Sequence, residues 1–208
     1  DQIGSEIGRL LDIIRELYGS LGFKYSFVVS TQPKDVIRMS EMITGVGTST
    51  DWKNTEAQLR SILESRNLSY SVEEGDGAFY APKIDVLIQD SLCRFHQCGT
   101  IQLDVQLPTK FNLKYKNEHA ENETPVLIHR AIYGSVCYGV DDDVLVERFL
   151  GVFIEHCNGR FPLFFSPYQV ALLPVSDDSH VQRCNEVVAT LRNHFKKDLR
   201  IDVMSPEL

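Results

Sequence analysis

Apolar positions at the start of the chain recur three and four residues apart, which predicts an amphipathic helix of about twenty residues that ends near Gly22. A short run of β-branched and aromatic residues, Tyr25–Ser30, predicts a strand. Polar, glycine-containing sequence follows, and a second helix is expected up to about Ser65, with Thr50 or Asp51 as its cap. The inward face of the first helix would consist of Ile3, Ile7, Leu10, Leu11, Ile14, Leu17 and Leu21.

The spacing of apolar residues then changes from the three- and four-residue repeat of a helix to the two-residue repeat of a strand. Ile84–Gln89 predicts a strand, and Gly99–Leu107 alternates between apolar and polar residues. Alternation places Thr100, Gln102, Asp104 and Gln106 on one face of a sheet. That face is either the solvated side of a half-exposed antiparallel strand or the polar wall of a ligand cleft. Further along we expect a polar hairpin loop over 116–124, a strand over 126–133 and a helix over 147–157.

A new pattern begins after the linker Phe161–Pro167. It predicts a strand over 169–174, a helix with Val188 and Leu191 on its apolar face, and a strand from Leu199, which together form a βαβ unit. The expected fold class is therefore α+β, with an antiparallel sheet flanked by helices in residues 1–165 and an incomplete α/β domain in residues 166–208. Because the chain starts with Asp1 in the middle of a helical pattern, we interpret it as a piece of a longer protein.

Composition narrows the class of protein. The chain has 208 residues, of which 43% are hydrophobic and 24% charged, so a disordered or fibrous protein is excluded. With 21 basic and 29 acidic residues the net charge is −8, and any contact with RNA must be local. No apolar run approaches the ~20 residues of a transmembrane helix, so no membrane partner is expected. The 5 cysteines form no CxxC pair, which argues against a disulfide framework and favours a reducing compartment.

Few single residues point to chemistry by themselves. His129 stands alone on an apolar strand, where a histidine is more often packed than metal-bound, and no second or third ligand lies at metal-like spacing. Arg130 and Arg148 occur in apolar sequence, and each needs an anionic partner, either a carboxylate in a salt bridge or a phosphate. The run Gly75–Lys83 is rich in glycine but lacks the spacing of a P-loop.

Three stretches together resemble the threonyl-tRNA synthetase family of class II aminoacyl-tRNA synthetases. They are Gly77–Asp85, Gln97–Asp104 and Ile128–Ser135, the last followed by Glu147–Phe149. The resemblance covers essentially the whole chain. It implies that residues 1–165 are the part of a class II catalytic domain that follows motif 2 and includes motif 3. Residues 166–208 would then begin an α/β anticodon-binding domain.

The resemblance also implies the reaction and its partners. The family ligates threonine to tRNA(Thr) with ATP, through a threonyl-adenylate, in the cytoplasm and as a homodimer. The arginine of motif 3 falls on Arg148, which with Lys83 is the expected catalytic pair. Gln97 and Arg148 would bind ATP, which is expected to carry Mg²⁺. The family's zinc ion has two ligands upstream of this chain, and its third falls on His129. The expected substrate-binding residues are Tyr80, Cys98, Thr100, Gln102 and Ser135.

Two departures from the family pattern leave alternatives open. Residues Val136–Val146 separate Ser135 from Glu147, where the family has a single residue. This insertion carries Asp141–Asp143, and three carboxylates near a phosphate site would repel ATP unless they loop outward, which we favour, or help to hold magnesium. The second departure is Gln32, where the family often has arginine. A catalytically inactive, synthetase-like RNA-binding or accessory protein is the alternative, and a synthetase for another amino acid is a third. This chain alone is expected to be inactive and to hold zinc poorly.

Overall fold

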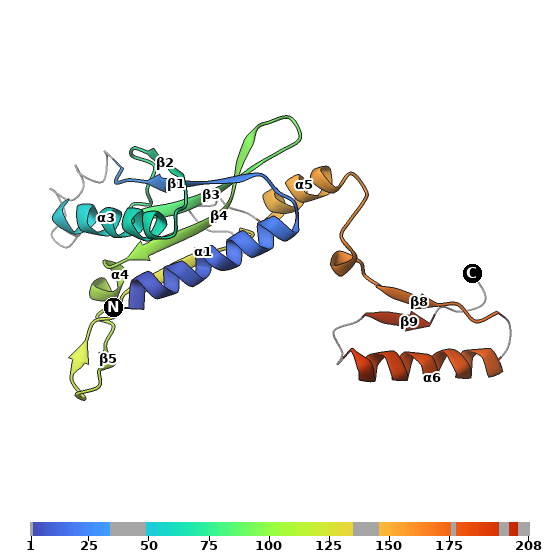
Figure 1. Ribbon diagram of the computed structural model, residues 1–208. Helices are drawn as coiled ribbons and strands as arrows, with labels where there is room; N and C mark the ends of the chain where they lie inside the picture. Colours follow the sequence, from blue (N-terminus) through green and yellow to red (C-terminus); the bar gives the residue numbers. More distant parts are fainter. Residues whose placement is uncertain (1, 34–48, 135–145, 176–177, 196–199, 204–208) are drawn as a thin grey trace. The chain divides into compact units, whose positions relative to one another are not determined.

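The computed structural model describes residues 2–33, 49–134, 146–175, 178–195 and 200–203 (Figure 1). The chain divides into two compact units, Asp1–His156 and Cys157–Leu208. Among the described residues, none of the helices is long and apolar enough to cross a membrane.

The first unit is built on a 5-stranded sheet with the strand order β2-β1-β3-β4-β7. The strands are β1 (Tyr25–Ser30), β2 (Tyr70–Glu73), β3 (Lys83–Gln89), β4 (Phe95–Asp104) and β7 (Leu127–Ala131). The β1–β3, β3–β4 and β4–β7 pairs are antiparallel, whereas β1 and β2 are parallel. A parallel pair needs a crossover connection, and here α3 lies between the two strands in the sequence. The sheet is therefore mixed, with one parallel pair at its edge.

Helices α1 (Gln2–Ser20) and α3 (Ser49–Ser65) pack against each other, and α3 packs on β1 and β3 (Figure 1). The amphipathic pattern predicted for the first helix is confirmed, because Ile7, Leu11 and Ile14 are fully buried. Helix α5 (Val146–Cys157) adds aromatic contacts: the ring of Phe149 lies 5.8 Å from that of Phe23 and edge-on to it. The core of the sheet itself is formed by Phe27, Val29, Ile84, Val86, Ile88, Ile101 and Leu103.

The strand predicted over Gly99–Leu107 is wrong for its last three residues. Strand β4 ends at Asp104, and a short helix, α4 (Leu107–Lys110), follows with Pro108 in its first turn. Proline suits the first turn of a helix because the missing N–H has no partner there. The Asp104 carboxylate accepts the backbone N–H groups of Gln106 at 2.9 Å and Leu107 at 3.0 Å, which turns the chain out of the sheet.

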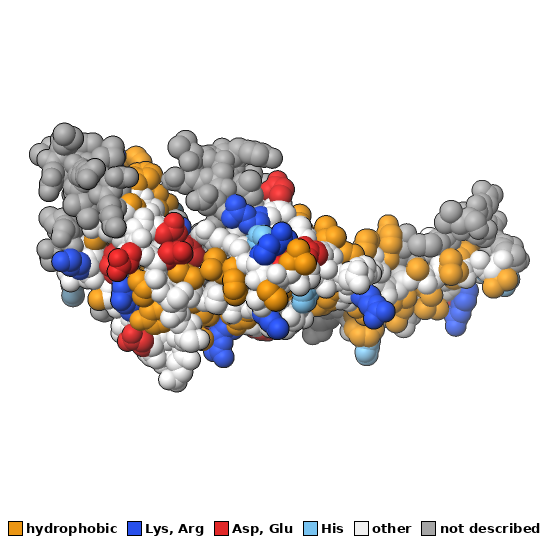
Figure 2. All heavy atoms as spheres, turned by 90° about the horizontal axis from the view of Figure 1, so that it is seen from above, with side chains coloured by type: hydrophobic (Ala, Val, Ile, Leu, Met, Phe, Trp, Pro, Cys, Tyr) orange, Lys and Arg blue, Asp and Glu red, His pale blue; other side chains and the backbone are white. Residues whose placement is uncertain are grey.

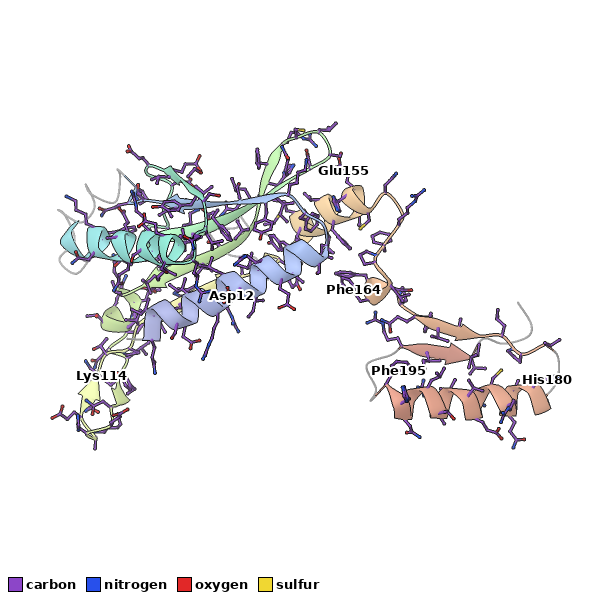
Figure 3. All side chains as sticks on the ribbon, viewed as in Figure 1. Asp12, Lys114, Glu155, Phe164, His180 and Phe195 are labelled. Atoms are coloured by element: carbon purple, nitrogen blue, oxygen red, sulfur yellow. The ribbon has the colours of Figure 1, made fainter. Side chains whose placement is uncertain are left out.

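The polar hairpin predicted over 116–124 is confirmed. Its strands are β5 (Tyr115–Lys116) and β6 (Asn122–Glu123), which pair antiparallel. Figure 3 labels Lys114 at the start of β5, and its ammonium donates to the hydroxyl of Thr124 at 2.8 Å. The exposed hairpin thus provides charged positions away from the sheet.

The second unit contains the predicted βαβ arrangement. It begins with a 3₁₀ turn at Leu163–Phe165, where Figure 3 labels Phe164, and continues with β8 (Val170–Leu172), α6 (Asp178–His194) and β9 (Ile201–Val203). Strands β8 and β9 are parallel, as expected for a crossover through a helix. The backbone N–H of Gln169 donates to the carbonyl of Arg200, and the Gln169 side chain accepts the N–H of Arg200, both at 2.8 Å, which joins the starts of the two strands. The α+β fold class is confirmed.

Candidate active site

Strand register brings the predicted site residues to one face of the sheet. Lys83 pairs with Gln102, Asp85 with Thr100, and Gln102 with His129. Residues directly opposite each other in an antiparallel pair project to the same side, and positions two apart on one strand do the same. The neighbouring positions Ile84, Ile101 and Leu103 face the other way into the apolar core. We call the set Ser30, Lys83, Asp85, Gln97, Thr100, Gln102, Asp104 and His129 the polar face.

Asp85 is the centre of a buried network on the polar face. Its Oδ2 accepts the Ser30 hydroxyl at 2.8 Å and lies 3.1 Å from the Lys83 ammonium, and its Oδ1 accepts the Gln97 amide at 2.5 Å. Asp76 is a second partner of Lys83, at 3.3 Å, and is largely exposed. A buried charge is tolerated when it is paired and hydrogen-bonded in this way. The network therefore fixes the positions of both Lys83 and Gln97.

Burial acts differently on the two members of the Lys83–Asp85 pair. Burial raises the pKa of Asp85 above its ordinary value, and the ammonium of Lys83 and the hydroxyls of Ser30 and Thr100 offset it only in part. Burial would lower the pKa of Lys83, but the carboxylates of Asp85 and Asp76 together raise it. With two carboxylates beside it, Lys83 stays charged and is suited to bind an anion.

A β-bulge decides which residues of β4 reach the polar face. Gly99 pairs with Val86 and Gln97 pairs with Leu87, so Cys98 is the extra residue of the bulge. Strict alternation from Thr100 would place Cys98 on the polar face and Gln97 behind it. The bulge instead turns Gln97 toward Asp85, and Cys98 is fully buried. Burial raises the pKa of Cys98 to about 11, against the effect of Arg148, so its thiol stays protonated at neutral pH.

His129 lies at the β7 end of the polar face. Its Nε2 is 2.9 Å from Oδ2 of Asp104, whose side chain is fully buried. Its ring centroid is 5.6 Å from that of Tyr80, and the Tyr80 hydroxyl donates to Oε1 of Gln102 at 2.5 Å. Tyr80, Gln102 and His129 therefore form a second polar group next to the Asp85 network, joined to it through the pairing of Lys83 with Gln102.

The two arginines singled out in the sequence differ in their surroundings. Arg148, in the first turn of α5, donates through Nη1 to the backbone carbonyl of Gln97 at 3.3 Å, which brings it next to the polar face. Arg130 is exposed on β7, opposite Ile101 and hence on the other side of the sheet. Because Arg130 is exposed, water can solvate its charge, and the need for an anionic partner predicted from the sequence stays untested. Ser135 and residues 136–145 of the insertion lie outside the described residues.

Several residues of the site are absent from the set predicted from the sequence. Ser30, Asp76 and Asp85 were not recognised, although a carboxylate at position 85 between Ile84 and Val86 is a signal that it needs a buried partner. Asp104 was identified only as one of the polar residues on its strand.

Gln32, the second departure from the family, donates its backbone N–H to Glu56 at 3.0 Å. Figure 2 shows acidic and basic side chains intermingled on the visible face of this unit.

Comparison with known proteins identifies the family. Residues 1–157 match the family described as "tRNA synthetase class II core domain (G, H, P, S and T)". The chain belongs to this family. Threonine–tRNA ligase 2 of Bacillus subtilis (strain 168) is 45% identical over 192 residues, which cover 92% of this chain and 27% of the relative. The threonine–tRNA ligase of Clostridioides difficile (strain 630) is 40% identical over 203 residues, or 98% of this chain and 28% of the relative.

Solved structures agree with this assignment. The crystal structure named as the RNA binding domain of threonyl-tRNA synthetase from Cryptosporidium parvum Iowa II has a TM-score of 0.71 and 37% sequence identity, and the match covers 98% of this chain and 46% of that one. A putative threonyl-tRNA synthetase from Aeropyrum pernix shares the fold, with a TM-score of 0.62. The chain spans little more than a quarter of the length of the curated relatives described above.

The zinc ion that the family resemblance implies needs ligands from elsewhere in the protein. Within the described residues no group of three or more His, Cys, Asp or Glu side chains could hold a metal ion. The surroundings of His129 nevertheless fit a ligand. A metal-bound histidine usually donates its second ring N–H to a carboxylate, and Asp104 lies 2.9 Å from Nε2. Among the described residues, His129 thus fits the role of one zinc ligand and Asp104 that of its carboxylate partner.

Proposed function

We propose that the protein containing this chain is a threonine–tRNA ligase that activates threonine with ATP and transfers it to tRNA(Thr). The observation that carries the proposal is the polar face. On the sheet of a class II synthetase core, its members Lys83, Gln97, Gln102 and His129 lie together with Tyr80. The two curated relatives described above are ligases for threonine. Residues 1–157 would supply part of the catalytic core, and the second unit would begin the anticodon-binding domain.

In the proposed reaction the carboxylate of threonine attacks the α-phosphorus of ATP. A bond forms between threonine and the phosphoryl group, the bond to the β-phosphate oxygen breaks, and pyrophosphate leaves. A hydroxyl of the terminal ribose of the tRNA then attacks the threonyl carbonyl, and AMP leaves with the bonding electrons. Both steps build up negative charge on phosphate oxygens. Fixed cationic groups in a site that excludes water stabilise such charge.

The polar face offers groups for each part of the substrate. The charged Lys83 and the guanidinium of Arg148 would bind phosphate oxygens of ATP, together with Mg²⁺, and Gln97 would contact the nucleotide. Tyr80, Thr100 and Gln102 would line the threonine side of the pocket, as would Ser135 from outside the described residues. Cys98 is buried, so any contribution to substrate binding would be to shape the wall of the pocket.

His129 would be the ligand that this chain contributes to zinc. When bound, zinc would supply a Lewis acid that engages the amino and hydroxyl groups of threonine. Valine is nearly isosteric with threonine but lacks the hydroxyl, and a site built to bind that hydroxyl rejects such an analogue strongly. The protein would act in the cytoplasm and, like its family, as a homodimer.

The test is ATP–pyrophosphate exchange with the full-length protein, purified with zinc. Threonine should stimulate exchange, while valine should not, and His129→Ala should abolish the response to threonine. Lys114→Ala on the exposed hairpin is the matched control and should leave exchange unchanged. The proposal would be refuted if no amino acid stimulated ATP–pyrophosphate exchange by a folded, zinc-loaded protein. That result would favour the alternative, a synthetase-like RNA-binding or accessory protein without catalysis.

A further inference from the structure

Asp104 takes part in three hydrogen bonds. It must accept the two from backbone N–H groups, whereas the direction of the third, with His129, depends on the tautomer of the histidine. Oδ1 accepts the backbone N–H groups of Gln106 at 2.9 Å and Leu107 at 3.0 Å, and Oδ2 lies 2.9 Å from Nε2 of His129. The Asp104 side chain is fully buried, whereas that of His129 is 38% exposed. The carboxylate is therefore held rigidly by the turn into α4, and the histidine ring reaches from this fixed point toward the open side of the polar face.

An ionised carboxylate has no proton to donate. Nε2 must therefore carry the proton in the hydrogen bond to Asp104, and neutral His129 then has its lone pair on Nδ1. Which nitrogen of a histidine binds a metal is set by the hydrogen bond that the other nitrogen makes. The fixed position of Asp104 thus selects one tautomer of His129 and one direction for its ring.

We infer that Asp104 is a positioning residue that makes Nδ1 of His129 the zinc-binding atom. This inference rests on the proposed function, because it concerns the zinc ion proposed for threonine recognition. Carboxylate partners of metal-binding histidines typically contribute a factor of about 10–100 to metal affinity. Asp104 would contribute this factor without touching either the metal or the substrate.

Asp104→Asn separates the two roles of the carboxylate, which are to accept the backbone N–H groups of the turn and to set the tautomer of His129. The asparagine oxygen can still accept the N–H groups of Gln106 and Leu107, which leaves the amide NH₂ facing His129. The flipped amide would point its NH₂ at two backbone donors and lose both hydrogen bonds, so it is disfavoured. The NH₂ group needs an acceptor, which forces the lone pair of His129 onto Nε2 and the proton onto Nδ1, the wrong tautomer for the metal.

The chain contains a matched control in the turn between β3 and β4. The side chain of Asp90 is 1% exposed, its Oδ2 lies 2.9 Å from Nε2 of His96, and its Oδ1 accepts the N–H groups of Leu92 at 2.9 Å and Arg94 at 2.8 Å. Asp90 also binds the Arg94 guanidinium. It repeats the geometry of Asp104 outside the polar face, so Asp90→Asn tests what the same amide substitution does to the fold.

The experiment measures zinc in the full-length protein. Wild type, Asp90→Asn and Asp104→Asn are loaded with Zn²⁺ and equilibrated against a chelator at graded concentrations, and bound zinc is measured by atomic emission. We expect wild type and Asp90→Asn to bind zinc equally and Asp104→Asn to bind it about 10–100-fold more weakly. Thermal unfolding of the two variants should be similar. If Asp104→Asn does not fold, Asp104→Ser replaces it, because serine can still cap the turn but cannot reach His129.

The outcomes separate this inference from the proposed function. Unchanged zinc affinity in a folded Asp104 variant would overturn the inference while leaving the proposed function intact. Loss of zinc from Asp90→Asn to the same extent would also overturn it, because the effect would then be one of stability. A wild-type protein that binds no zinc would overturn it as well, and threonine-dependent pyrophosphate exchange in the same preparation would decide separately on the proposed function.

Discussion

Replacing Lys83 with methionine should destabilise the sheet mainly by leaving the Asp85 carboxylate buried without its cation. Methionine keeps the length of the side chain and removes the ammonium, which lies 3.1 Å from Asp85. The Lys83 and Asp85 side chains are 9% and 4% exposed, so solvent replaces little of the lost interaction. Removing one partner of a buried ion pair costs about 3–5 kcal/mol.

We expect the lower end of this range, about 3 kcal/mol, because Asp85 keeps two hydrogen-bond donors, Ser30 and Gln97. Asp85 can also take up a proton, since burial already raises its pKa in the wild type. The folded state of Lys83→Met then binds a proton more readily than the unfolded state does. Stability should fall as the pH rises through the interval between the unfolded and folded pKa values of Asp85. The loss in Lys83→Met should therefore be smaller in acid than at neutral pH.

Hydrogen-exchange mass spectrometry of the full-length protein measures this loss locally, in peptides that cover β3 and β4. A cost of about 3 kcal/mol corresponds to exchange on the order of 100-fold faster at these amides. Lys114→Met is the control, because Lys114 lies on the exposed hairpin in Figure 3 and should change stability by less than about 0.5 kcal/mol. Equal exchange in the two variants, or a loss that does not shrink on acidification, would refute this account of the network.

Three further variants test neighbouring contacts. Burial would raise the pKa of Asp90, but hydrogen bonds from His96 and Arg94 outweigh it and hold this pKa below its ordinary value of 3.8. The wild type should therefore lose stability as the pH falls below that value. In Asp90→Asn the free energy of unfolding should depend less on pH over the same acid range. Tyr18→Phe removes the 2.6 Å hydrogen bond from the hydroxyl of the buried Tyr18 to the carbonyl of Ile132 and should cost about 0.5–1.5 kcal/mol in denaturant unfolding. Gly99→Ala would place a methyl group 3.1 Å from the Tyr18 hydroxyl and 3.2 Å from two backbone carbonyls, and should lower the melting temperature through overpacking of about 1–3 kcal/mol; an unchanged value would contradict the register of β4.

Local patterns predicted the elements whose stability is encoded in their own residues. The strand Tyr25–Ser30 has the bounds expected from its apolar residues, and the first helix follows its repeat. By contrast, Tyr70–Glu73 carries mostly exposed side chains and forms a strand because its backbone pairs with β1. Alternation also failed beyond Asp104, where Pro108 and the Asp104 carboxylate start a helix instead.

Part of the candidate site was predictable because regular alternation along a strand can be read from the sequence. Lys83, Thr100 and Gln102 share a face because their strands alternate regularly, and the resemblance to a known family selected them. The bulge at Cys98 cannot be seen in the sequence, and it turns Gln97 toward Asp85, where regular alternation from Thr100 would have placed Cys98 on that face. Pairing between distant residues, such as Asp104 with His129, likewise depends on register rather than on spacing.

The most direct test of the central claim is the identity of the amino acid that the full-length protein attaches to tRNA. The protein, with ATP, Mg²⁺ and zinc, is incubated with unfractionated tRNA and an equimolar mixture of threonine, serine and valine, and the aminoacyl-tRNA is isolated and hydrolysed. The account predicts threonine, recovered on tRNA(Thr). Recovery of another amino acid, or tRNA that is bound but never acylated by a folded protein, would contradict it.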